Sequence, residues 1–328
     1  MNHVDKAVRQ RLISRFGREV ESWFETLPDI LDALAESWRI DLGEPIPRGS
    51  MSVVLRCRTE DAHPAVLKIS PHRARIATEI ASLRQWKTNR TPTVLAADEQ
   101  LGALLIEAIQ PGTPLAVSGK YPRVEEVGEL LTSLHATGDA RRPYPTVAER
   151  ARHLFASGAK LYERQPELAD IVSRDLYEKG RALANRLAAD AFPTVLLHGD
   201  LTPSNILDGG KRRALVAIDP APCVGDAAFD AVDLTLWQSE DVETIEARAE
   251  WIASATGNSA DRLLAWCTAF AGMVALELAG APDASPKAVG ALTTLASRAS
   301  AGPRTPTRDL PDQRSRRYAH PTDGPSDR

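Results

Sequence analysis

The spacing of hydrophobic positions changes twice over the first third of the chain. Over residues 5–40 apolar side chains recur every three or four positions, as at Val20, Phe24 and Leu27, which predicts helix, with Pro28 in the first turn of a second helix. Four short apolar runs separated by turn residues then predict a small, mostly antiparallel sheet, at residues 53–55, 65–67, 93–95 and 103–106. A single helical pattern, over residues 73–87, interrupts these strands.

The run Gln110-Pro111-Gly112-Thr113-Pro114 breaks this periodicity and is the candidate boundary between two lobes. Helical spacing prevails beyond it, and a short β insertion at residues 194–219 interrupts the helices. The predicted helices span residues 123–137, 146–163, 171–189, 227–238, 242–256, 260–278 and 286–300.

The resulting fold class is α+β with two lobes. We expect a helical appendage at residues 1–38, a small sheet lobe at 39–110 and a larger, mostly helical lobe at 111–300. Residues 301–328 are rich in Pro, Arg, Asp and Ser and nearly devoid of aliphatic side chains, which predicts a disordered tail.

Composition narrows the function classes only slightly. The 328 residues are 43% hydrophobic and 26% charged, which is typical of a globular protein, and the net charge of −4 argues against a nucleic-acid partner. The three cysteines lie far apart, which argues against a disulfide framework and against a structural zinc site. We read neither an export signal nor an uninterrupted apolar stretch of membrane-spanning length, and so expect a cytoplasmic protein with no membrane partner.

The most informative residues follow two apolar strands. Asp200 comes directly after the run Val195-Leu196-Leu197-His198-Gly199, Asn205 follows five residues later, and Asp219 ends the run Leu215-Val216-Ala217-Ile218. Phosphoryl transfer needs a carboxylate to orient the attacking hydroxyl and accept its proton, and further oxygen ligands to hold Mg²⁺ against nucleotide phosphates. The spacing of Asp200 and Asn205 also matches the catalytic loop of kinases.

In these motifs the chain resembles the aminoglycoside phosphotransferases, which share the protein-kinase fold. The resemblance rests on His198-Gly199-Asp200 with Asn205, on Ile218-Asp219, and on Gly225-Asp226 and Phe229-Asp230, and it extends over about residues 39–295. The run Ala217-Ile218-Asp219-Pro220 is most similar to the branch of streptomycin 6-kinases and hydroxyurea antibiotic-resistance kinases. Thr202 departs from that branch, which usually has His at this position.

The resemblance implies a role for each of these side chains. Asp200 would be the catalytic base, and Asn205 and Asp219 would be the Mg²⁺ ligands. Lys68, in the strand pattern Ala65-Val66-Leu67-Lys68-Ile69, would contact the α- and β-phosphates of ATP. Glu79 is the acidic residue of the helix that follows and would be the ion-pair partner of Lys68.

Other positions would complete the nucleotide site. The turn Pro47-Arg48-Gly49-Ser50-Met51-Ser52 has a single Gly in place of a glycine-rich loop, and Ser50 and Ser52 would help to cradle phosphate oxygens. Glu107 and Ile109, at the end of the last strand, would flank the adenine through their backbone groups. We interpret His135, His198, Asp226 and Asp230 as structural.

The sequence therefore predicts transfer of the γ-phosphoryl group of Mg-ATP to a hydroxyl of a small molecule, with aminoglycosides such as streptomycin the leading class. Acidic residues of the helical lobe would attract a cationic acceptor: Asp233, Glu240, Asp241 and Glu243. Hydroxyurea, a sugar and an amino-alcohol metabolite remain alternative acceptors, and a non-catalytic nucleotide-binding regulatory module is an alternative of another class. The oligomeric state would be a monomer or a homodimer.

Overall fold

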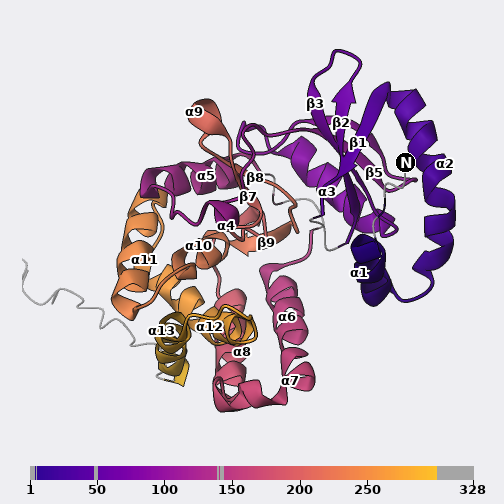
Figure 1. Cartoon of the computed structure of the whole chain (residues 1–328). Coiled ribbons are helices and arrows are strands. Elements are labelled where there is room, and N and C mark those ends of the chain that lie inside the picture. The colour runs from indigo at the N-terminus through magenta and orange to yellow at the C-terminus, as the bar shows by residue number, and fades with distance from the viewer. Residues whose placement is uncertain (1–3, 5, 48–50, 139, 141–143, 301–328) are drawn as a thin grey trace, which may run out of the picture.

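A five-stranded antiparallel sheet forms one end of the molecule, and helices form most of the rest (Figure 1). The computed structural model describes residues 4, 6–47, 51–138, 140 and 144–300, so the predicted tail at 301–328 lies outside the described residues. The strands run in the order β1-β2-β3-β5-β4. Their bounds are β1 Ile40–Pro45, β2 Val53–Thr59, β3 Pro64–Ile69, β4 Val94–Asp98 and β5 Ala103–Glu107. Sequence reasoning did not identify β1, whose six residues include both Gly43 and Pro45.

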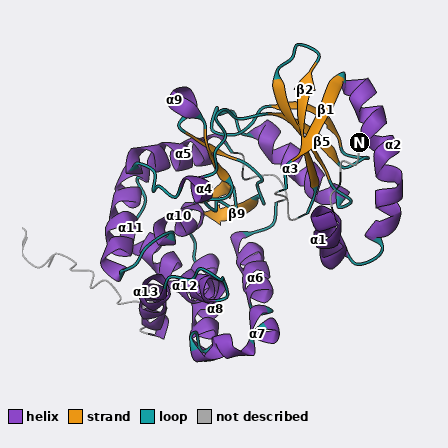
Figure 2. Cartoon of the chain, in the orientation of Figure 1, coloured by secondary structure: helices purple, strands orange, loops and turns teal. Residues whose placement is uncertain are grey.

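The two faces of this sheet are buried by different helices. Ala65, Leu67 and Ile69 of β3 point toward helices α1 (Lys6–Phe16) and α2 (Val20–Trp38) and share a core with them. Because side chains alternate along a strand, Lys68 points to the opposite face. Helix α3 (Arg73–Gln85) packs on that face, with Leu104 in a core that continues into the helical lobe. Figure 2 shows α2 running along the outer side of the sheet, away from the helical lobe.

The expected position of Pro28 was wrong. Helix α2 begins at Val20 and contains Pro28 in its interior. The break between the two helices lies at Gly17 instead of near Pro28. Gly17 has a φ of 80°, a left-handed conformation that favours glycine and ends α1. The apolar residues of α2 still fall on one face, so the loss of one helical hydrogen bond at the proline is offset by burial of Phe24, Leu27 and Leu31 against the sheet.

Helices surround the core of the second lobe. Within residues 108–300 the α-helices are α4 Leu115–Ser118, α5 Val124–Thr137, α6 Val147–Gly158, α7 Leu161–Arg164, α8 Arg174–Ala189, α9 Gly210–Arg213, α10 Val232–Leu236, α11 Val242–Thr256, α12 Ala260–Ala279 and α13 Pro286–Ser297. The 3₁₀ helices in the described part of this lobe are η1 Pro166–Asp170, η2 Ala227–Ala231 and η3 Arg298–Ser300. By length and composition α12 could cross a membrane, and this is the only such helix in the described part of the chain. Most of its apolar window is buried within the fold, as in the core helix of a globular protein.

Two short antiparallel strand pairs lie at and just beyond the predicted β insertion. Strand β6 (Thr194–Leu197) pairs with β9 (Cys223–Asp226), and β7 (Ile206–Asp208) pairs with β8 (Leu215–Ala217). The predicted end of this insertion, at residue 219, was wrong, because β9 extends it to Asp226. The four residues Cys223-Val224-Gly225-Asp226 are too few to show a period, and their strand conformation depends on pairing with β6, about 30 residues earlier.

Candidate active site

The loop after β6 is held by a buried carboxylate. Asp230, on η2, accepts hydrogen bonds from the backbone amides of His198 (2.7 Å) and Gly199 (2.8 Å), and its Oδ2 atom lies 3.1 Å from Nε2 of His135. Gly199 has a φ of 74°, and a Cβ atom there would lie 2.1 Å from the carbonyl oxygen of Ala221. Only glycine fits this position, so the Gly of the His-Gly-Asp motif allows the loop to turn.

This loop presents Asp200 between two hydrogen-bond donors. Nδ2 of Asn205 donates to Oδ2 of Asp200 (3.0 Å) and to its carbonyl oxygen (2.9 Å). From α6, Arg150 donates through Nη2 to Oδ1 of Asp200 (3.0 Å) and through Nε to the carbonyl oxygen of Gly199 (2.7 Å). The carboxylate is therefore fixed on both sides. Sequence reasoning missed Arg150, which lies 50 residues before its partner in a helix without a recognisable motif.

The β7–β8 pair brings Asn205 next to Asp219. Asn205 immediately precedes β7, and its carbonyl oxygen accepts a hydrogen bond from the amide of Ile218 (2.8 Å), the residue before Asp219. Thr202, at the position that departs from the streptomycin kinase branch, uses its carbonyl oxygen to accept the amide of Asn205 (2.8 Å). Asp219 itself has a φ of 57°, a left-handed conformation that Asp adopts more readily than most residues.

Lys68 joins Asp219 to the sheet lobe. Its Nζ atom lies 2.8 and 2.7 Å from the two carboxylate oxygens of Glu79 and 2.5 Å from Oδ1 of Asp219. The structure thus contains the Lys68–Glu79 ion pair that the sequence predicts. Burial alone would lower the pKa of Lys68, but the Asp219 and Glu79 carboxylates raise it above its ordinary value. Lys68 is therefore charged at neutral pH.

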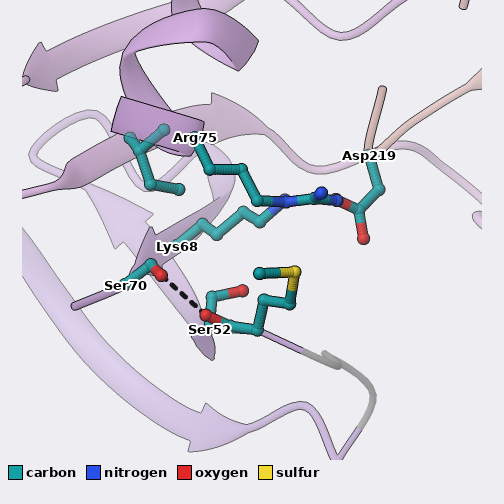
Figure 3. A pocket seen from close by; sticks show the side chains of 7 residues that line it. Ser52, Lys68, Ser70, Arg75 and Asp219 are labelled. Carbon is teal, nitrogen blue, oxygen red and sulfur yellow. Dashed lines mark hydrogen bonds and ion pairs between the residues drawn. The ribbon is translucent and has the colours of Figure 1, made fainter. Parts of the chain in front are cut away.

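Arg75, on α3, is a second cation beside the Asp219 carboxylate. Nη2 of Arg75 lies 3.7 Å from Oδ1 of Asp219, and both side chains line a pocket with Lys68, Ser52 and Ser70. Figure 3 shows Lys68 and Arg75 reaching toward Asp219 side by side. Although burial opposes the shift, these two cations hold the pKa of Asp219 below its ordinary value.

The serine positions lie at the edge of this pocket. Ser52 is buried, and Ser70 donates from its hydroxyl to the carbonyl oxygen of Met51 (2.6 Å). This bond fastens the end of the turn to β3. Ser50 lies outside the described residues, as do Arg48 and Gly49 of the predicted phosphate-binding turn.

The two residues expected at the adenine edge differ in their surroundings. Glu107 ends β5, and its Oε1 atom accepts hydrogen bonds from the amide of Thr93 (2.9 Å) and from Nη1 of Arg213 (2.9 Å). Its side chain therefore links the strand to α9 of the helical lobe. Ile109 is buried, and within the described ranges no hydrogen-bond partner is found for its amide. An adenine contact through these backbone groups stays a prediction.

The remaining motif residues hold the lobe together. Asp226 accepts hydrogen bonds from Arg262 Nε (2.6 Å), Trp266 Nε1 (2.7 Å) and the amide of Ala228 (3.0 Å). It therefore caps η2 and ties it to α12. His198 is fully buried, and its Nε2 atom lies 3.0 Å from the carbonyl oxygen of Ile218. Burial lowers the pKa of His198, so its ring is neutral. The ring connects the loop that carries Asp200 with the segment that carries Asp219.

An acidic environment borders Asp200. Burial, Asp200 and Glu277 raise the pKa of Asp233 to about 7, and Arg150 partly opposes them. Of the four acids expected to attract a cationic acceptor, Asp233 is the one that the structure brings into this environment. Asp241 instead caps α11 by accepting the amide of Thr244 (2.6 Å), and Glu240 accepts a hydrogen bond from Ser285. Sequence reasoning missed Glu277, which gave no local signal within the apolar helix α12.

The motif residues of this site belong to a segment that matches a known protein family. The profile of the aminoglycoside/hydroxyurea antibiotic resistance kinases matches residues 37–280. The chain belongs to this family. The protein is therefore a small-molecule kinase, a phosphotransferase that acts on a small-molecule hydroxyl, and all the motif residues described above fall within the matched segment.

Individual relatives agree with this family membership. A streptomycin 6-kinase of Streptomyces glaucescens is 28% identical over 69% of this chain and 70% of its own length. A hydroxyurea phosphotransferase of Kitasatospora aureofaciens is 31% identical over 65% of this chain and 61% of its own length.

Solved structures match the fold of this kinase at lower identity. A choline kinase of Streptococcus pneumoniae has a TM-score of 0.56 at 15% identity, covering 84% of this chain and 99% of its own. The aminoglycoside phosphotransferase APH(4)-Ia has a TM-score of 0.55 at 15% identity, with 84% and 100% coverage. These likenesses establish the protein-kinase-like fold.

Proposed function

We propose that this kinase transfers the γ-phosphoryl group of ATP, with Mg²⁺, to a hydroxyl of an aminoglycoside such as streptomycin. The observation that carries the proposal is the contact between the acidic motif of one lobe and a buried lysine of the other. Asp219 contacts Lys68 directly, and Asp200 and Asn205 are connected to Asp219 through the β7–β8 pair. A nucleotide bound at Lys68 would have its phosphates next to the Asp200 carboxylate.

The oxygen atoms available at this site fit a magnesium ion. Nδ2 of Asn205 is used by Asp200 and Oδ1 of Asp219 by Lys68, whereas Oδ1 of Asn205 and Oδ2 of Asp219 have no hydrogen-bond partner among the described residues. No group of three or more His, Cys, Asp or Glu side chains in the described ranges could hold a metal alone. Two protein oxygens that need phosphate and water to complete the shell are typical of Mg²⁺, which when bound would neutralise charge on the phosphates.

Asp200 would orient the acceptor hydroxyl and take its proton. Its Oδ1 and Oδ2 atoms each already accept one hydrogen bond, from Arg150 and Asn205, and a carboxylate oxygen has a second lone pair for the incoming hydroxyl. With the carboxylate fixed in this way, less motion has to be frozen when the acceptor arrives. The side chain is 30% exposed, so the acceptor has access from solvent.

The charge around Asp200 favours a cationic acceptor. Asp233 and Glu277 both have raised pKa values, caused first by burial and then by the neighbouring Asp200, so these three acids lie close enough to repel one another when ionised. A guanidinium or ammonium group on the acceptor would relieve this repulsion. The streptomycin 6-kinase relatives support an aminoglycoside, and the hydroxyurea phosphotransferase relative supports hydroxyurea as the second candidate acceptor.

The proposal is tested by ADP release in a coupled assay with ATP and Mg²⁺, across streptomycin, other aminoglycosides, hydroxyurea, sugars and amino alcohols. We expect acceptor-dependent turnover that the Asp200→Ala variant lacks. Asp175→Ala, which changes an exposed carboxylate on α8, is the matched control and should retain full activity. Nucleotide binding without turnover on any acceptor would contradict the proposal and favour a regulatory module.

A further inference from the structure

Lys68 has little capacity left for a nucleotide. An ammonium group has three donors, and Lys68 directs them at both carboxylate oxygens of Glu79 and at Asp219. Glu79 is 1% exposed and belongs to the core, so it cannot turn to water without leaving a buried charge unpaired. Only the donor that faces Asp219 can be redirected to a phosphate. A triphosphate bound in this pocket therefore needs another cation.

Arg75 is placed to supply it. Within the described residues that line the pocket, Arg75 and Lys68 are the two cationic side chains. The backbone amide of Arg75 donates to Nδ1 of His72 (3.2 Å), the N-cap of α3, which fixes the helix at this position. Among the described residues its guanidinium makes only a long ion pair, with Asp219 at 3.7 Å, and its side chain is 25% exposed. The guanidinium thus has donors to spare and access to solvent.

We infer that Arg75 is a second cationic ligand of the nucleotide and binds its terminal phosphate, whereas Lys68 binds the phosphates nearer to the adenosine. The inference rests on the proposed use of a nucleoside triphosphate. Arg75 reaches toward Asp219 from α3, at 3.7 Å, and Asp219 is the carboxylate proposed as a ligand of the metal ion (Figure 3). A guanidinium also matches phosphate oxygens with two parallel hydrogen bonds, which an ammonium cannot do.

The charges in the pocket support the same assignment. Two cations, Lys68 and Arg75, face two carboxylates, Glu79 and Asp219, so the pocket is neutral as described. When Asp219 turns to a metal ion, both cations lose a partner at the same time. Arg75 then has a charge beside the phosphates, with no other carboxylate within ion-pair distance among the described residues.

Nucleotide affinity separates this role from a structural one. Isothermal titration would give the Kd of ADP and of the non-hydrolysable triphosphate AMP-PNP, each with Mg²⁺, for the wild type, Arg75→Gln and Arg75→Lys. Arg73→Gln is the matched control, because Arg73 is exposed in the same turn of α3 and its stem lies near Gly102, outside the pocket. Thermal unfolding of each variant checks that it folds.

We expect Arg75→Gln to raise the Kd of AMP-PNP at least about tenfold and to change the Kd of ADP less than about threefold, because only the triphosphate has the terminal phosphate. Arg75→Lys should lose part of the AMP-PNP affinity and carries the same test if Arg75→Gln is unstable. Arg73→Gln should bind both nucleotides as the wild type does. Equal weakening of both nucleotides by the Arg75 variants, or no change in either, would overturn the inference and leave the proposed function standing. Failure of the wild type to bind either nucleotide would instead refute the proposed function, and the inference with it.

Discussion

Replacing Asp230 by Asn removes one charge from the support of the catalytic loop and leaves the side-chain shape unchanged. The two Asp230 oxygens accept the amides of His198 and Gly199 and contact Nε2 of His135. An Asn side chain has one acceptor oxygen and one amino group. Whichever way it turns, the amino group meets a backbone N–H that also donates, so one buried donor is left without a partner.

The size of this effect follows from those contacts. The Asp230 side chain is fully buried, so losing one charge-assisted hydrogen bond and weakening two others should destabilise the protein by about 3 kcal/mol. For a chain of this length that corresponds to a fall in Tm of roughly 4 to 5 °C. Asp200 directly follows Gly199, so its carboxylate should also shift, and kcat should fall by about tenfold or more.

The pKa of Asp230 determines how this loss of stability depends on pH. Burial alone would raise the pKa of Asp230, but His135 and the backbone amides hold it below its ordinary value of 3.8. The native state therefore favours the ionised form, whose contribution is complete above the unfolded pKa and is lost as the pH falls through the lower, folded pKa. The Tm difference between wild type and Asp230→Asn should be constant from about pH 6 to pH 8 and shrink only below about pH 4.

Thermal unfolding monitored by circular dichroism, together with steady-state kinetics, measures both effects. Asp175→Asn, which neutralises an exposed carboxylate, should change neither quantity appreciably. If Asp230→Asn unfolds within about 2 °C of the wild type and keeps its kcat, the argument that Asp230 supports the catalytic loop is refuted.

Two further variants test neighbours of Asp200. Arg150→Gln should lower kcat about tenfold with little change in the KM for ATP, because Arg150 contacts the Asp200 carboxylate and does not line the pocket at Lys68. Arg150→Lys should recover part of the loss, and an unchanged kcat in Arg150→Gln would contradict this prediction. The pKa of Asp233, raised to about 7, means that the native state prefers the protonated acid, so stability is lost as the pH rises through about 7. Asp233→Asn should therefore gain Tm relative to the wild type between pH 5 and pH 8, and parallel Tm curves would contradict this.

Much of the secondary structure could be predicted from local patterns in the sequence. The helix at residues 242–256 is predicted with the observed bounds, because Asp241 caps its start and Gly257 ends it in a left-handed conformation. The catalytic loop is likewise local, since Asp200 and Asn205 lie five residues apart and contact each other directly. The Lys68–Glu79 pair was predictable because a strand and the next helix are adjacent in most folds.

Features that depend on distant partners could not be read in this way. Arg150 and Arg75 stand in ordinary helical sequence, and their partners are 50 and 144 residues away. Strand β9 exists because β6 pairs with it, and the acids near Asp200 are selected by how α10 and α12 pack. Helices α1 and α2 form part of the core beneath the sheet, which their own periodicity shows only as an apolar face without a partner.

The most direct test of the central claim follows the phosphoryl group itself. ATP labelled in its γ-phosphate is incubated with Mg²⁺, the protein and streptomycin or hydroxyurea, and the products are separated. We predict that the label appears on the acceptor, and that this transfer is lost with Asp200→Ala. Label found only in inorganic phosphate, or on the acceptor to the same extent without Asp200, would contradict the account.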